Sequence, residues 1–233
     1  MEIDNIILLR TLILVIPFLI LFGFFYSRVR DTFFLKPRTD IQINIIMICL
    51  AIVFIETVYW NIELKNYEFF GYDLNSSSAS DGSNIILISL GILAAVFGWL
   101  FTYRGQVLTA TRSHSIQTLM ASRLSNEYME QVRFATEVYN NYKNNNLNQI
   151  SHAEFNELTG EKIAAILYLL NYLEFISVGI RFGDLDEKLM KNTMKSIIGA
   201  NYTFFEQIIK EKQAKSPSLY EHLTALNNRW NAK

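Results

Sequence analysis

Three apolar segments in the first 103 residues constrain the fold of this chain more than any other feature. They cover residues 6–26, 41–61 and 85–103. A helix rises about 1.5 Å per residue, so each segment is close to the length that crosses a hydrocarbon core of roughly 30 Å. The sequence therefore predicts a transmembrane domain at residues 1–103 and a bilayer as its surroundings.

The two loops between these segments differ in charge. The loop at residues 27–40 carries four basic residues, and the loop at residues 62–84 carries one basic residue, Lys65, with four acidic ones. Basic loops stay on the cytoplasmic side of a membrane. We therefore expect the N-terminus outside, the first loop inside, and the tail from Arg104 onward in the cytoplasm.

A cleaved signal peptide is the alternative interpretation of the first apolar segment. The residues before it, MEIDNIILL, are acidic rather than basic, and no small-residue cleavage pattern follows. Phe24, Phe25 and Tyr26 are bulky residues at the place where such a pattern would lie. These features favour an uncleaved span.

The composition of the tail excludes several classes of function. Residues 104–233 hold 15 Lys and Arg against 13 Asp and Glu, so the tail lacks the basic excess of a nucleic-acid binder. The single cysteine, Cys49, lies in the second span, and the three histidines are far apart in the sequence. P-loop, GxGxxG, HExxH and GxSxG motifs are absent. We expect no metal, no cofactor, no sequence-specific nucleic-acid partner and no enzymatic activity.

The tail has the pattern of a helical bundle. A stalk helix at residues 104–124 continues the third span, and further helices are expected near residues 127–143, 161–181 and 184–215. Ser151 and Glu154 have the spacing of a capping box, and Gly183 suits a left-handed helix end. Ser216 and Pro217 are expected to begin the last helix. The predicted fold is all-α: three transmembrane helices followed by a cytoplasmic bundle at residues 104–233.

One segment of the tail, Ile163–Ile180, is apolar enough to be a fourth span. Asn171 and Glu174 interrupt it, and a fourth span would export a tail rich in basic residues against the charge rule. We favour a helix buried at the centre of a soluble bundle.

Two charged residues lie inside the predicted spans. Arg10 and Glu56 are each a few residues from the outer end of their span, which places them at a similar depth. Placing a charge in hydrocarbon raises the free energy by roughly several kcal/mol unless the charge is paired, hydrated or reaches the surface. The pair is open to three interpretations: separate contacts with the outer surface, a structural ion pair, or a gate or pore-lining charge.

Small residues recur along the third span. Gly91, Ala94, Ala95 and Gly98 include two pairs spaced four apart, and such faces allow helices to approach closely. The contact could lie within the chain or between subunits. Because three spans make a thin bundle, we expect a homo-oligomer.

Two groups of charged residues in the tail are further candidates. Arg112, His114, Arg123 and Arg133 lie on or near the stalk. In an oligomer they could form a cationic cup for an anionic ligand such as a cyclic nucleotide, and the alternative is a solvated face near anionic lipid.

Glu174 lies on the most apolar helix of the tail. We expect it to form a structural ion pair with Arg181 or Arg229, because no base, nucleophile or metal cluster accompanies it.

The tail resembles a known protein family. The segment RGQVLTATRSHSIQTLMASRLSNEYMEQVRFATEVY, the segment LLNYLEFISVGIRFGDLDEKLMKN and the closing Asn-Arg-Trp at Asn228–Trp230 are similar to a bacterial family of membrane-tethered helical domains. This family has no assigned activity, so the resemblance implies no catalytic residue. The layout of the whole chain also resembles membrane effectors of bacterial antiphage systems, which is an analogy of architecture.

These observations lead to one expected function and two alternatives. We expect an effector, or effector subunit, in the bacterial inner membrane that disrupts the membrane in abortive infection. A cytosolic protein or a small signal ligand would trigger its cytoplasmic domain. The alternatives are a non-enzymatic scaffold that docks a cytosolic partner, and a channel gated by a nucleotide messenger.

Overall fold

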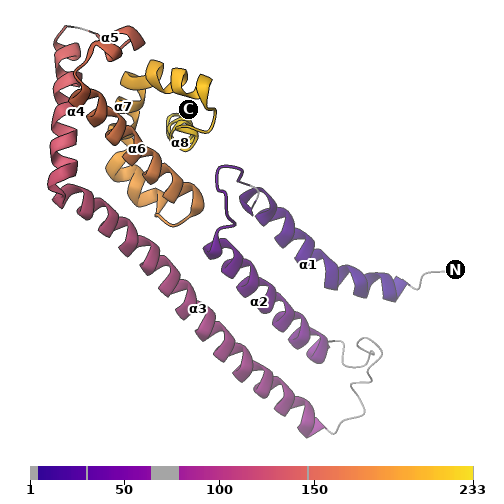
Figure 1. The fold of residues 1–233 in the computed structure, drawn as a ribbon. Coiled ribbons are helices and arrows are strands. Elements are labelled where there is room, and N and C mark those ends of the chain that lie inside the picture. Colours follow the sequence, from indigo (N-terminus) through magenta and orange to yellow (C-terminus); the bar gives the residue numbers. More distant parts are fainter. Residues whose placement is uncertain (1–4, 30, 64–78, 146, 233) are drawn as a thin grey trace. The chain divides into compact units, whose positions relative to one another are not determined.

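The structure is a computed structural model that describes residues 5–29, 31–63, 79–145 and 147–232. Within these ranges, the side chains of residues 5–10, 27–28, 60–63 and 79–86 fall outside the description. The described part contains eight helices and no strand (Figure 1). The all-α fold predicted from the sequence is therefore confirmed.

Three described helices are long and apolar enough to cross a membrane. The apolar stretches are Thr39–Tyr59 in α2 (Thr39–Glu63), Leu87–Leu124 in α3 (Ala79–Leu124) and the whole of α6 (Gly160–Phe182). A shorter apolar stretch, Thr11–Tyr26, lies in α1 (Asn5–Val29). These lengths and compositions are compatible with a membrane protein.

The chain divides into two compact units. The first unit comprises residues 1–31 and 37–108, and the second comprises residues 32–36 and 109–233. In the first unit α1 packs against α2, and Arg104 Nε of α3 donates a hydrogen bond of 2.9 Å to Asn44 Oδ1 of α2. α3 contributes to both units, because the division falls between Leu108 and Thr109.

The second unit is a bundle with α6 at its centre. α6 packs against α4 (Asn126–Asn144), α7 (Glu187–Lys215) and α8 (Glu221–Asn231), while the short α5 (His152–Glu157) packs against α7. Among the most apolar 18 residues of α6, 44% are buried inside the protein, against 11% for those of α2 and 6% for those of α3. The apolar residues of α6 thus have a protein core to occupy, and its largest fully buried side chains are Ile166, Leu170, Leu173, Ile176 and Ile180.

Most boundaries of the bundle helices follow local capping rules. Ser151 and Glu154 form the predicted capping box, and Gly183 ends α6 in the left-handed region at φ 76°. α7 begins one residue after Asp186, whose carboxylate accepts a hydrogen bond from Leu189 N. Each cap satisfies an amide or carbonyl that a helix end leaves without a partner.

The start of the last helix is a correction to the sequence prediction. Residues 217–220 form a turn, and α8 begins at Glu221 rather than at Pro217. Tyr220 precedes it with φ 56°, in the left-handed region, and makes no side-chain cap. The first amides of α8 receive their partner from another helix, as described below.

Gly179 is the position where α6 needs a glycine for close packing. A Cβ atom there would lie 2.7 Å from Leu185 Cδ1 and 2.9 Å from Leu185 Cγ. The amides of Asp184 and Leu185 both donate to Gly179 O, which folds the chain after α6 back against it. Leu185 is buried, so this turn sets the path from α6 into α7.

Candidate functional site

The most distinctive site in the second unit is the docking of residues Thr32–Lys36, here called the docked loop. This loop connects α1 to α2, yet it packs with the helical bundle. Leu35 N donates a hydrogen bond of 2.8 Å to Arg181 O at the end of α6. Arg181 Nε in turn donates to Phe33 O at 3.1 Å. The main chain and the side chain of one arginine therefore both bind the loop.

A second arginine covers the aromatic rings of the docked loop. The guanidinium of Arg229, on α8, lies 4.3 Å from the ring centroid of Phe33 and 5.1 Å from that of Phe34. Glu187 of α7 orients this guanidinium through hydrogen bonds of 2.6 and 3.2 Å. Each cation–π contact of this kind contributes about 0.5–2 kcal/mol. The loop is thereby attached to α6 and α8, and α7 supports this contact through Glu187.

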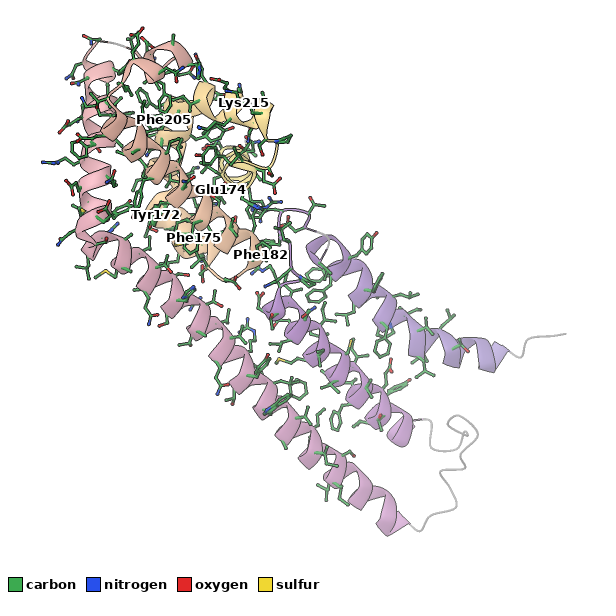
Figure 2. All side chains as sticks on the ribbon, viewed as in Figure 1. Tyr172, Glu174, Phe175, Phe182, Phe205 and Lys215 are labelled. Carbon is green, nitrogen blue, oxygen red and sulfur yellow. The ribbon has the colours of Figure 1, made fainter. Side chains whose placement is uncertain are left out.

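The end of the docked loop makes a third cation–π contact, in which the loop supplies the cation and the bundle supplies the ring. Lys36 Nζ of the loop lies 5.0 Å from the ring centroid of Phe182. Phe182 is the last residue of α6 and is labelled in Figure 2. Two aromatic rings and one ammonium of the loop thus contact the bundle, and two guanidiniums and one aromatic ring of the bundle contact the loop.

His222 extends the site behind Arg181. Arg181 Nη1 donates to His222 Nδ1 at 2.7 Å, and His222 Nε2 lies 3.3 Å from Glu221 Oε1. Because a guanidinium can only donate, the geometry assigns Nδ1 as an acceptor and places the ring hydrogen on Nε2. This chain of contacts holds Arg181 in the direction of the docked loop.

Glu174 connects α6 to the start of α8. Its carboxylate accepts hydrogen bonds from His222 N at 3.2 Å and Leu223 N at 2.6 Å (Figure 2). It therefore acts as the N-terminal cap that Tyr220 does not supply. Burial raises the pKa of Glu174 above its usual value, and the two amide hydrogen bonds oppose that shift.

The predicted ion pair between Glu174 and Arg181 or Arg229 is wrong. In the described structure Glu174 binds backbone amides, Arg181 binds Phe33 and His222, and Arg229 binds Glu187. The cause is the N-terminal start of α8, where amides without a partner and the helix dipole attract a carboxylate.

The four basic residues predicted near the stalk have separate surroundings. Arg112 Nε forms an ion pair of 3.3 Å with Asp186, and the guanidinium of Arg133 lies over the ring of Phe134 at 5.0 Å. Arg123 lies near Tyr128, whose pKa it lowers against a larger increase from burial. His114 is exposed on α3. The described contacts within one chain assemble no anion site from these four residues.

The predicted charge pair in the spans falls partly outside the described residues. The side chain of Arg10 is not described, so its relation to Glu56 stays a prediction. Glu56 lies in α2, and its Oε1 atom is buried without a hydrogen-bond partner among the described residues.

The small residues of the third span are exposed on α3. Gly91, Ala94, Ala95 and Gly98 all face away from the described contacts of their own chain. A Cβ atom at Gly91 or Gly98 would meet nothing within 4 Å. These residues are therefore not explained by packing within the chain.

Sequence reasoning missed the docked loop, Glu187 and His222 as site residues. One signal was present: Phe33, Phe34 and Leu35 form an apolar run between Asp31 and Lys36 in a loop that carries four basic residues. Adjacent aromatic side chains favour a partner surface, because leaving aromatic rings exposed to water is energetically unfavourable. The partners themselves lie more than 140 residues away in the sequence, and no local pattern identifies them.

The described residues contain no cluster of three or more His, Cys, Asp or Glu that could hold a metal ion. The protein family described as "Domain of unknown function (DUF4760)" matches residues 85–230. No curated protein and no solved structure matches the chain.

Proposed function

The chain belongs to the DUF4760 family, and we propose that it is a membrane effector whose helical bundle controls its membrane segment. The docked loop is the observation that carries this proposal. Residues 32–36 join two apolar helices, α1 and α2, and bind α6 and α8 of the bundle. A bundle that the membrane helices only anchored would need a single connection to them, whereas this bundle has two, through α3 and through the docked loop.

The number of connections between the bundle and the membrane segment supports the proposed control. α3 runs from an apolar stretch directly into the bundle, and the docked loop is the second connection. A rearrangement of α6 or α8 would move Arg181 and Arg229, and with them the loop and the ends of α1 and α2. Such a device needs two states and a ligand that binds one of them more tightly.

The proposed outcome is a loss of the membrane barrier. Glu56 supports it, because a carboxylate in an apolar helix is costly and marks polar paths through membranes. The proposed setting is the bacterial inner membrane, with the N-terminus outside and the bundle in the cytoplasm. Antiviral defence by abortive infection is the role that the layout of the chain suggests, with a cytosolic protein or a small ligand as the trigger.

The experiment expresses the full chain in bacteria, challenges the cells with phage and records membrane potential with a voltage-sensitive dye. The proposal expects wild-type cells to depolarise and stop growing before phage release. Arg229→Ala should change this response at equal protein level in the membrane, because it removes the contact with Phe33 and Phe34.

The matched control is Arg133→Ala. Arg133 is exposed and lies over Phe134 of its own helix, remote in the sequence from the docked loop. It should leave the response unchanged. A wild-type chain that never alters membrane potential under any phage challenge would contradict the proposal.

A scaffold is the second candidate, and one observation favours it. Phe175, which Figure 2 labels, lies on α6. It is 60% exposed, and Tyr168 on the same helix is 39% exposed. They lie seven residues apart on one face of the helix and offer an apolar surface for a cytosolic partner. A scaffold would protect cells without depolarising them, and Phe175→Ala would abolish that protection.

A further inference from the structure

Two large apolar side chains are exposed on the part of α3 that follows the predicted span at residues 85–103 and its flanking Arg104. Ile116 is 52% exposed and Met120 is 48% exposed. They follow Arg104 by 12 and 16 residues in the sequence, so they lie about 18–24 Å further along the helix. Water would surround them there, and exposed apolar side chains in a row mark interaction surfaces.

The chain itself covers a different face of this helix. Ser115 is fully buried and Leu119 is 9% exposed, and Ser115 Oγ accepts a hydrogen bond of 2.8 Å from Asp186 N. Leu100 and Arg104 are the corresponding contacts earlier in α3. Ile116 follows Ser115 and Met120 follows Leu119, so each is turned by about 100° around the helix from that buried neighbour.

The face that carries Ile116 and Met120 continues along the whole of α3. Ile116 lies about seven helical turns after Gly91 and so shares its direction. Between them, the same direction holds small exposed residues: Ala95, Gly98, Thr102, Gly105 and Thr109. A Cβ atom at Gly91, Gly98 or Gly105 would meet nothing within 4 Å.

A partner of this face has to cover both the glycines in the predicted span and the apolar side chains of Ile116 and Met120 beyond it. Lipid tails do not require glycine every seven residues, and they do not reach side chains in water. A cytosolic protein can cover Ile116 and Met120 but not Gly91. The occupant must cross the membrane as a helix and continue into the cytoplasm in the same direction, and α3 of another copy, 46 residues long, has this form.

We propose that this face of α3 binds a second copy of the chain, through the same face of its α3, as a parallel pair. Copies enter the membrane in one orientation, so equal positions meet across a two-fold axis. The glycines at intervals of seven residues allow close approach in the span, and such spacing keeps two helices in contact along a left-handed supercoil. Ile116 and Met120 then bury each other in the cytoplasmic half.

The charge at the edge of this face is compatible with a parallel pair. Arg112 lies between the exposed face and the face packed in its own chain, and Asp186 of the same chain binds it at 3.3 Å. Each copy therefore brings its own counter-charge, and the repulsion between two arginines at equal heights is reduced.

The test is oxidative cross-linking in membranes that contain the full chain. Cys49 is the only native cysteine, so Cys49→Ala provides a background for single cysteines. Ile116→Cys and Met120→Cys should form disulfide-linked dimers at least roughly fivefold more than His114→Cys and Gln117→Cys, because equal positions meet only on the axis. The two control positions are exposed at similar heights of α3 but point elsewhere.

A second pair of variants tests the membrane half. Gly98→Ile should reduce the Met120→Cys dimer to the control level, because a large side chain would hold the helices apart. Gly23→Ile in α1 should not, although a Cβ atom there also meets nothing within 4 Å. Equal cross-linking at all four cytoplasmic positions, or an unchanged dimer in Gly98→Ile, would overturn the proposal. The readout is independent of any effect on membrane potential.

Discussion

Removal of the Glu174 carboxylate should weaken the bundle by exposing the start of α8. Glu174→Ala leaves the amides of His222 and Leu223 without their acceptor. A hydrogen bond to a charged group contributes about 1.5–3 kcal/mol, and water replaces part of it at this half-buried site. We therefore expect the free energy of unfolding to fall by about 2 kcal/mol. Glu174→Gln should lose less, since its carbonyl still accepts one hydrogen bond.

The assay is unfolding of the detergent-solubilised full chain, followed by near-ultraviolet circular dichroism. Glu137→Ala is the matched control, because Glu137 is exposed on α4. Exposed substitutions of this kind change stability by about 0.5 kcal/mol or less. Equal stability of Glu174→Ala and Glu137→Ala would refute the assignment of Glu174 as the cap of α8.

The same carboxylate gives a pH dependence of defined sign. The folded protein holds the proton of Glu174 more tightly than the unfolded chain, because burial raises its pKa from 4.5. Its contribution to stability is complete below pH 4.5 and is lost as pH rises through the raised pKa. Relative to Glu174→Gln, the wild-type protein should therefore lose stability as pH rises through this window. A gain of stability there would contradict the burial of the group.

Three further predictions concern other parts of the chain. Gly179→Ala should destabilise the bundle by about 1–3 kcal/mol, because the new Cβ would press on Leu185. Gly199→Ala on α7 should stabilise it by about 0.5–1 kcal/mol, because the nearest neighbour of the new Cβ is 3.8 Å away. Chemical denaturation of both variants measures the two changes. Burial raises the pKa of Tyr128 to about 12. In an ultraviolet titration, the difference between the wild-type protein and Tyr128→Phe reports the Tyr128 phenolate, which should appear only in strongly alkaline solution. A reporter enzyme fused after Lys233 should be active only in the cytoplasm, and one inserted at Ser77 only outside, while the opposite pattern would overturn the predicted orientation.

Features fixed by neighbouring residues were predictable from the sequence. The capping box at Ser151 and Glu154, the left-handed end at Gly183 and the buried helix over Ile163–Ile180 each depend on a pattern within one helix or turn. Hydrophobic periodicity and cap chemistry are local, so one sequence is enough to read them.

Features that depend on distant partners were not predictable in the same way. Arg181 and Phe33 are 148 residues apart in the sequence, and Glu174 and Leu223 are 49 apart. The sequence showed that Glu174 needed a partner, but two arginines and several backbone amides were all available to it. Which of them it meets depends on how α6 and α8 pack, and the unexpected turn at residues 217–220 moved the start of α8 next to Glu174.

The most direct test of the coupling between bundle and membrane segment is a double-mutant cycle on the docked loop, read as membrane potential. Phe33→Ala and Arg229→Ala remove two sides of one contact, whose ring and guanidinium are 4.3 Å apart. Each should change the phage-induced depolarisation, and the double variant should change it no more than the stronger single variant, because effects at one contact do not add. Two variants that behave as wild type at equal protein level, or whose effects add fully, would contradict the account.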